Sequence, residues 1–357
     1  MQIKINKLPK SEIEIEGELA AEILEQFFTQ ALKKIAETAE IDGFRKGKVP
    51  ESILLSKIPE IQILEEAAEM ALGEHYPKII AEQNLDVISR PAITITKLAR
   101  NNPLGFKILT TTLPEVKLPD YKDRAKNIKS GLTEKDLDTA VTSEEIENTI
   151  MDIRKSRAPK KTMPEVAAEQ DENNENPQIP EASEENLPPW NDEFVQTLGD
   201  FKDIAEFRTK LEANLQVEKQ NLVREKTRLK IIEDIIEKSE IDVPEVLIDL
   251  EVDKILYRME SDIAQMGLQF EDYLKHLNKS VEDLRNDFRN DGEKRAKLAL
   301  VLNEISKAEK ILADEEEVAK EVAHILEHYK DADPERARIH AENMLTNEKI
   351  FQFLENL

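Results

Sequence analysis

Residues 164 to 189 place the strongest limit on how this chain folds. The segment contains five of the 16 prolines and eight acidic residues, and it lacks Lys, Arg, Gly and aromatic residues. A segment of this composition buries too little apolar surface to offset the conformational entropy that ordering would cost. Its like charges repel one another, which favours an extended linker. We therefore expect the 357 residues to form an elongated, multidomain protein with folded parts on either side.

The first 113 residues carry the pattern of a small α+β domain. Isoleucines at positions 3, 5, 13 and 15 alternate with other residues, which predicts a β-hairpin over residues 2 to 17. The segments "AITITKL" and "FKILTTTL" predict two further strands. Between the hairpin and these strands, apolar residues at helical spacing predict helices over residues 19 to 39 and 61 to 83. Pro50 suits the first turn of a shorter helix.

Residues 114 to 189 are predicted to form an extended linker. It contains one short amphipathic helix, at residues 143 to 157, for which Ser143 is the expected N-cap. The acidic, proline-rich segment then follows. This region contains no glycine between Gly131 and the end of the linker, and we expect it to be mostly extended.

Residues 190 to 357 are expected to form an all-α body with long helices. Asp203 and Glu206 have the spacing of a capping box, and the helix that they start extends to about residue 238. Four further helices are expected, beginning near Pro244, Ser280, Asp314 and Pro334. Long helices joined by short turns are typical of projecting arms.

Charge and composition exclude several classes of protein. The net charge of −25 opposes non-specific nucleic-acid binding by the chain as a whole. The absence of cysteine excludes disulfides and thiolate chemistry. The N-terminus shows no secretory signal, and no apolar run approaches the roughly 20 residues of a membrane span. We expect a cytoplasmic protein that does not enter the membrane.

The sequence predicts no catalytic residue, cofactor or metal site. "GFRKGK" has three residues between its glycines where a Walker phosphate loop has four, and Val49 stands where that loop needs Ser or Thr. His324 and His328 are four residues apart, but Ile325 occupies the place of the Glu that follows the first His in zinc proteases. We interpret the two histidines as a surface coincidence.

The segment at residues 43 to 57 is basic within an acidic chain. It has four cations and a single acid, Glu51. An ordinary helix-to-helix turn would explain the charges, but a large apolar side chain such as Phe44 is unusual on a loop. Cations neutralise phosphates, and an exposed aromatic ring can stack on an unpaired base or enter an apolar pocket. The candidate docking residues are Gly43, Phe44, Arg45, Lys46, Gly47, Lys48 and Pro50.

Apolar residues at helical spacing form a second candidate surface. Packing against a neighbouring helix is the interpretation we favour for any one of them. The alternative is a partly exposed lining that holds unfolded chains, to which flexible methionines are suited. The candidate client-binding residues are Leu256, Met259, Ile263, Met266, Leu298 and Leu302.

The octapeptide "GFRKGKVP" resembles the ribosome-binding signature of trigger factor, a bacterial nascent-chain chaperone. The segments "LPPWNDEFVQTLGDFKDIAEFRTKLEANL" and "EKRAKLALVLNEISKAEKI" resemble the C-terminal helical body of that family. The resemblance covers about residues 1 to 157 and 188 to 357. It implies docking on the large ribosomal subunit beside the tunnel exit, through a ribosomal protein and ribosomal RNA. It also implies that the helical arms hold nascent or unfolded polypeptides without ATP.

The sequence departs from the family in one respect. Members usually carry an FKBP-type peptidyl-prolyl isomerase domain, rich in glycine and aromatic residues, between these two parts. Here there is no glycine between Gly131 and Gly199, and the acidic segment occupies that place. We therefore expect no isomerase activity. The alternative function is a cytosolic helical scaffold or assembly chaperone without ribosome binding. A homodimer of the free protein is left open.

Overall fold

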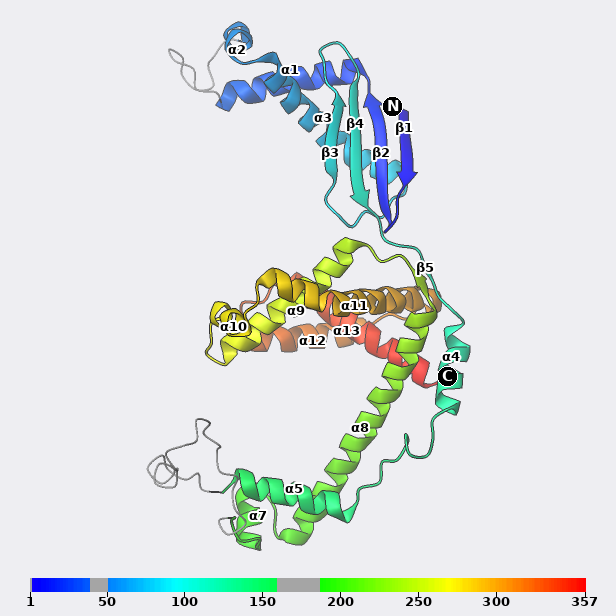
Figure 1. The fold of residues 1–357 in the computed structure, drawn as a ribbon, viewed down its shortest axis with the longest axis vertical. Helices are drawn as coiled ribbons and strands as arrows, with labels where there is room; N and C mark the ends of the chain where they lie inside the picture. The colour runs from blue at the N-terminus through cyan, green and yellow to red at the C-terminus, as the bar shows by residue number, and fades with distance from the viewer. Residues whose placement is uncertain (1, 39–50, 159–186) are drawn as a thin grey trace. The chain divides into compact units, whose positions relative to one another are not determined.

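The computed structural model describes residues 2 to 38, 51 to 158 and 187 to 357 (Figure 1). The chain divides into two compact units. Unit 1 combines residues 1 to 120 with residues 235 to 350, and unit 2 combines residues 121 to 234 with residues 351 to 357. Each unit is therefore built from segments that are far apart in the sequence.

The N-terminal part of unit 1 is a four-stranded antiparallel sheet covered by helices. The strands are β1 (Gln2–Lys7), β2 (Glu12–Leu19), β3 (Ala92–Lys97) and β4 (Leu104–Thr111), in the order β1-β2-β4-β3. The helices are α1 (Ala21–Thr38), α2 (Glu51–Lys57) and α3 (Glu60–Glu82). The predicted order of two strands, helices and two strands is confirmed.

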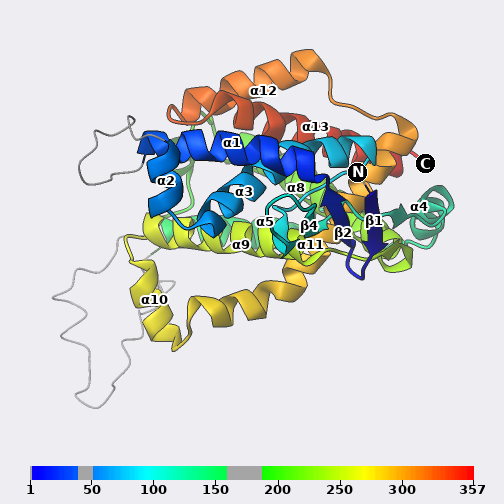
Figure 2. The ribbon, with the colours of Figure 1, turned by 90° about the horizontal axis from the view of Figure 1, so that it is seen from above.

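Alternation along β2 explains why helices cover only one face of this sheet. Ile13 and Ile15 are buried, whereas Glu14 and Glu16, which alternate with them, are only half-buried. The inward residues pack against an apolar face of α1 that includes Leu24. Seen from above, the helices lie beside the sheet (Figure 2). Burial at alternate positions on β2 and at helical spacing on α1 builds one continuous core.

The remainder of unit 1 is almost entirely helical. Strand β5 (Val116–Lys117) pairs antiparallel with β6 (Glu240–Ile241), which joins distant parts of the chain. The helices are α9 (Glu245–Gln265), α10 (Phe270–Leu277), α11 (Val281–Glu309), α12 (Glu315–His328) and most of α13 (Pro334–Glu355). Helices α9 and α11 run side by side and share a core with α10 (Figure 1).

Capping chemistry defines several helix ends. At the start of α11 the Ser280 N–H donates to Asp283 Oδ2 at 2.9 Å, and the Asp283 N–H donates to Ser280 Oγ at 3.1 Å. After α9, Gly267 adopts a φ of 77°, a left-handed conformation that glycine reaches at low cost. Both ends agree with the predicted helix boundaries.

Unit 2 contains α4 (Tyr121–Ser130), α5 (Ser143–Ser156), α7 (Asp192–Leu198) and most of α8 (Ile204–Lys238). The N-cap of α5 is Thr142, which corrects the expectation of Ser143. Thr142 takes this position because its hydroxyl accepts the Glu145 N–H at 3.2 Å while its own N–H donates to Glu145 Oε2 at 2.8 Å. Together these bonds form a capping box.

The short helix α5 is part of a packed cluster. Its Ile150 is buried with Val195 of α7 and Phe207 of α8, and Trp190 packs against the same cluster. The sequence predicts this helix within an extended linker. The structure instead packs it into unit 2, because an amphipathic helix has an apolar face to bury.

Candidate functional site

The seven predicted docking residues, from Gly43 to Pro50, lie outside the described residues. The helices on either side are described: α1 ends at Thr38 and α2 begins at Glu51. The segment that contains the docking residues therefore connects two helices of the N-terminal domain, in agreement with the helices predicted on either side of it.

The surface next to this connection has both charge and apolar area. Lys33 and Lys57 are exposed. The side chains of Leu55 and Ile61 are 46% and 48% exposed. Lys34 Nζ lies 2.5 Å from Glu66 Oε1, and this hydrogen bond raises the pKa of the lysine. Lys34 is thus engaged within the domain, whereas Lys33 and Lys57 are exposed cations on α1 and α2, the helices on either side of the undescribed segment.

The structure separates the six predicted client-binding residues into two groups. Leu256, Ile263 and Leu302 are 8%, 5% and 3% exposed, so they belong to the protein interior and offer no surface to a client in this structure. Met266 is 73% exposed. The other two, Met259 and Leu298, are half-buried.

The burial of Leu256 has a clear physical cause. It lies in the apolar cluster shared by α9, α10 and α11, together with Val252 and Leu300. At Leu256, the apolar residues at helical spacing on α9 therefore pack against α11. For Leu256 the structure agrees with helix packing, the interpretation favoured from the sequence, and client contact by the six residues stays a prediction.

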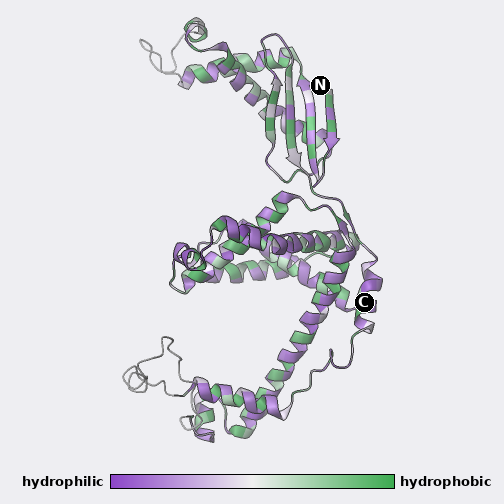
Figure 3. Ribbon diagram, in the orientation of Figure 1, coloured by the Kyte–Doolittle hydropathy of each residue, from purple (hydrophilic) through white to green (hydrophobic). Residues whose placement is uncertain are grey.

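Sequence reasoning missed most of the exposed apolar residues of this region. They occur on α9, at the turn after it, and at the junction of α10 and α11, and we call them the exposed arm residues: Leu250, Tyr257, Met266, Leu268, Leu277 and Val281. Tyr257, 75% exposed, directly follows buried Leu256. Apolar residues alternate with hydrophilic ones along α9 and α11 (Figure 3). No local signal distinguishes the inner face from the outer one when both carry apolar residues.

Ion pairs hold α9 against α11 alongside this apolar seam. Arg285 of α11 pairs with Asp253 of α9, and Arg289 of α11 pairs with Glu245. Glu245 also accepts a hydrogen bond from Lys10 in the β1–β2 turn, and the bonds from Lys10 and Arg289 lower the pKa of Glu245. These pairs are partly exposed, so each contributes roughly 0 to 1 kcal/mol to stability.

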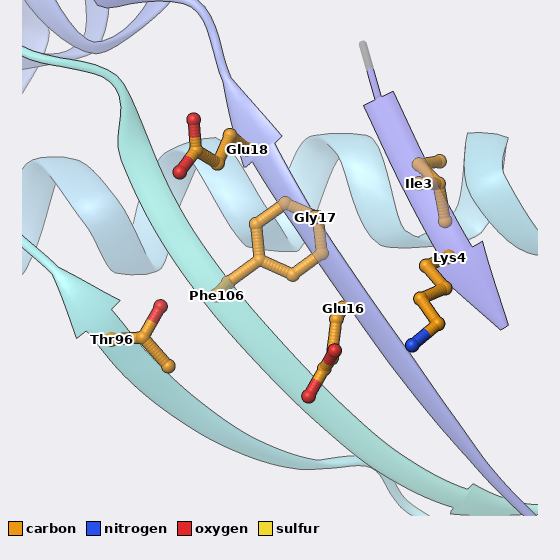
Figure 4. Close-up of a pocket in the computed structure, with 7 residues that line it drawn as sticks. All are labelled: Ile3, Lys4, Glu16, Gly17, Glu18, Thr96 and Phe106. Atoms are coloured by element: carbon orange, nitrogen blue, oxygen red, sulfur yellow. The ribbon is translucent and has the colours of Figure 1, made fainter. Parts of the chain in front are cut away.

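A hollow of about 780 Å³ opens on the sheet of the N-terminal domain (Figure 4). Its polar lining consists of Lys4, Glu16, Glu18 and Thr96. It contains no histidine or serine beside the carboxylates.

The two histidines of α12 lie close together. Their ring centroids are 4.5 Å apart, and His328 Nδ1 is 3.0 Å from the His324 carbonyl oxygen. Among the described residues there is no group of three or more side chains suited to hold a metal ion. In the described part of the chain, no helix is both long enough and apolar enough to cross a membrane.

Two family models cover most of the chain. A model of the bacterial trigger factor protein matches residues 1 to 153, and a model of the trigger factor C-terminus matches residues 203 to 354. The chain belongs to the trigger factor family. Members associate with the ribosome and with nascent chains, and this protein is accordingly a ribosome-associated chaperone.

Individual relatives agree with this assignment over nearly the full length. Trigger factor from Carboxydothermus hydrogenoformans is 25% identical, with 96% of this chain and 95% of that protein covered. Trigger factor from Geobacillus kaustophilus is also 25% identical, with 92% and 91% covered. The fold is shared with a solved structure from a study of promiscuous substrate recognition in folding and assembly activities of the trigger factor chaperone. The TM-score is 0.57 and the sequence identity is 17%, with 100% of this chain and 99% of that chain covered.

The trigger factor from C. hydrogenoformans contains residues that have no counterpart here. The alignment has 412 positions and includes 96% of this chain, which is about 343 of its 357 residues. About 70 positions of the alignment are therefore gaps in this chain. Residues 154 to 202, between the two matched models, are the internal segment that neither family model matches.

Proposed function

We propose that this trigger factor is an ATP-independent cytoplasmic chaperone that docks at the ribosomal tunnel exit through residues 43 to 50 and holds nascent or unfolded polypeptides. The signature "GFRKGKVP", in a chain that both family models match, carries the proposal. Its place between the end of α1 and the start of α2 supports a role as a loop presented by a folded domain.

Docking is explained by the chemistry of the loop. Arg45 and Lys46 neutralise phosphates of ribosomal RNA, and Phe44 enters an apolar pocket of a ribosomal protein or stacks on an unpaired base. Exposed Lys33 and Lys57 add positive charge on the supporting helices. The remainder of the chain is acidic and would be repelled by RNA, which confines the contact to this end.

Holding is assigned to the helical body. The exposed arm residues include Tyr257 and Met266, each more than 70% exposed, which leaves apolar area for a client to cover. Flexible methionine adapts to different apolar partners. Weak apolar contact suits a chaperone that must release its client without nucleotide hydrolysis.

The domain organisation follows the family with one part missing. We propose a docking domain at residues 1 to 113, a connecting region at 114 to 189 whose helices α4 and α5 belong to unit 2, and a helical client-binding body at 190 to 357. The unmatched segment at 154 to 202 and the roughly 70 alignment positions without a counterpart support loss of the isomerase domain. The protein would then be a chaperone without the catalytic activity of its relatives.

Co-sedimentation with 70S ribosomes tests the docking proposal. Replacing Phe44, Arg45 and Lys46 by alanine should weaken binding by on the order of 3 to 6 kcal/mol, because two charge-assisted contacts and one buried ring are lost. Binding of the unmodified protein should also fall as salt concentration rises.

A matched control removes the same kinds of side chain, one aromatic ring and two cations, from a different part of the chain. The variant Tyr329→Ala/Lys330→Ala/Lys320→Ala deletes one aromatic ring and two cations from exposed positions on and beside α12, and it should bind ribosomes normally. Undiminished binding of the loop variant would remove the loop from the interface. If the unmodified protein does not sediment with ribosomes at all, the scaffold function without ribosome contact is preferred. Sedimentation velocity of the free protein decides whether it forms a homodimer.

A further inference from the structure

Strand β3 is an open edge with unusual side chains. It stands at the end of the order β1-β2-β4-β3, and among the described residues no further strand pairs with its free side. All six of its residues, "AITITK", are exposed. Ile93 and Ile95 retain 43% and 37% of their exposure. An exposed edge strand with apolar side chains is a template for pairing with another chain, and natural proteins usually block such edges.

Ile93 and Ile95 are exposed because β3 is the last strand of the sheet. Ile93 pairs in register with Ile108 of β4, and Ile95 pairs with Phe106. Those partners are 0% and 1% exposed, beneath the helices. Paired residues lie on the same face of a sheet. The apolar face therefore continues from the core onto β3, where it is no longer covered.

The opposite edge of the same sheet differs. On β1, Ile3 and Ile5 pack against the core, and Lys4 and Lys7 lie on the same six-residue strand. Lysines on an edge strand disfavour further pairing. Only one cation, Lys97, lies on β3, at its end, where its Nζ is 2.5 Å from Glu18 Oε1. The sheet is thus blocked at one edge and open at the other.

We propose that β3 binds an extended segment of an unfolded polypeptide by strand addition. The free N–H and C=O groups of β3 bind the backbone of the client, and apolar client residues at alternate positions pack on Ile93 and Ile95. Backbone hydrogen bonds are the same for every sequence, so this mode accepts many clients and selects only for extended, apolar stretches. The inference rests on the proposed holding function and adds a second site, on the docking domain.

The charge of the chain favours a client over a second copy as the occupant. Two copies would each bring a net charge of −25, and their mutual repulsion opposes association. An unfolded segment carries no such obligatory charge. The register shift between Ile95 and Lys97 interrupts regular pairing at the end of the strand. The structure therefore limits the added strand to about five or six residues.

Two peptides test whether the backbone is what β3 recognises. The first is a fluorescent peptide with eight central residues of alternating Val and Thr, and the second is the same peptide N-methylated throughout that segment, which removes its backbone donors. Anisotropy with the full chain should show at least a tenfold weaker affinity for the methylated peptide. Hydrogen exchange should show protection of amides in residues 92 to 97 when the unmodified peptide binds. Equal affinities, or no gain in protection at β3, would overturn the proposal.

A pair of variants ties binding to the edge. Ile93→Lys/Ile95→Lys should weaken binding of the unmodified peptide at least tenfold. Ile339→Lys, which changes an exposed isoleucine (53%) on α13, should leave it unchanged. Equal affinity for both variants would contradict the assignment. Protection of β3 that grows with protein concentration in the absence of peptide would show that a second copy is the occupant.

Client aggregation, measured beside peptide binding, separates the edge site from the holding function itself. If the unmodified full chain suppresses aggregation of an unfolded protein but binds both peptides equally, the edge proposal fails and holding stands. If the full chain holds no client of any kind, the proposed function fails.

Discussion

Gly292 of α11 lies directly against Val252 of α9. A Cβ atom placed on Gly292 would stand 2.7 Å from Val252 Cγ2 and 3.1 Å from the Ile248 carbonyl oxygen. Since one of these neighbours is backbone, the helices would have to separate to accept a side chain. This glycine sets the spacing of α9 and α11, which carry three of the six exposed arm residues: Leu250, Tyr257 and Val281.

Gly292→Ala should therefore destabilise the helical body. Overpacking costs about 1 to 3 kcal/mol, which outweighs the roughly 1 kcal/mol that alanine gains over glycine in a helix. Urea unfolding monitored by circular dichroism measures the change. Gly73→Ala is the matched control, because Gly73 is exposed on α3 and a Cβ atom added there would have no neighbour within 4 Å. The control should keep or raise stability; a stable Gly292→Ala protein would contradict the close-packing account.

The contact between α5 and α8 should depend on acid pH. Glu145 accepts a hydrogen bond from Lys219 Nζ at 2.7 Å and another from the Thr142 N–H at 2.8 Å, and these bonds lower the pKa of Glu145 to about 2. The folded-state pKa is below the unfolded value of about 4.5. The stabilisation is therefore complete above about pH 4.5 and is lost as the pH falls toward 2.

Glu145→Gln should accordingly lower the urea midpoint of unit 2 at pH 7, and the difference from the unmodified protein should shrink below about pH 4.5. Trp190 is the single tryptophan and packs beside Phe207 in the cluster that contains α5, so its fluorescence reports on this unit. Glu144→Gln changes the neighbouring exposed carboxylate in the same first turn and serves as control. A constant difference across this pH range would exclude Glu145 as the titrating group.

Buried and exposed apolar residues on α9 and in the turn after it should have opposite roles. Tyr257→Ser/Met266→Ser removes two side chains that are 75% and 73% exposed, so stability should change by less than about 0.5 kcal/mol per site. Suppression of client aggregation should fall. Leu256→Ala empties a buried position and should cost about 2 to 5 kcal/mol. Light scattering of a refolding client, read beside urea unfolding of each variant, separates the two roles. Full holding activity in the double variant would show that clients bind elsewhere.

The purified protein should not accelerate cis/trans isomerisation of an X-Pro test peptide. Uncatalysed isomerisation takes tens to hundreds of seconds at about 25 °C, so even weak catalysis is measurable. A trigger factor that contains the isomerase domain is the positive control. Catalysis that survives deletion of residues 164 to 189 would place an active site in the folded parts of this chain.

Local patterns in the sequence determined most of the secondary structure. Alternating isoleucines predicted the hairpin, and the strands β1 and β2 occupy residues 2 to 7 and 12 to 19. The helix predicted at residues 61 to 83 is observed at 60 to 82. The N-cap at Ser280 could be predicted from the sequence because its hydrogen bonds join Ser280 and Asp283, which are only three residues apart. Helix periodicity and capping depend on residues within one or two turns, and a single sequence contains that information.

The sequence also contains the segment at residues 43 to 50 that resembles a ribosome-binding signature, and it determined the family of the chain. It could not decide which apolar residues are interior. Leu256 and Tyr257 are adjacent, yet one is 8% and the other 75% exposed, because α11 packs on only one side of α9. Ile93 and Ile95 read as ordinary strand residues, and only the end position of β3 leaves them uncovered. Residues 116 and 117 pair with 241 and 240 across more than 120 positions. Burial and strand pairing depend on neighbours brought together from distant segments, so the tertiary structure alone decided them.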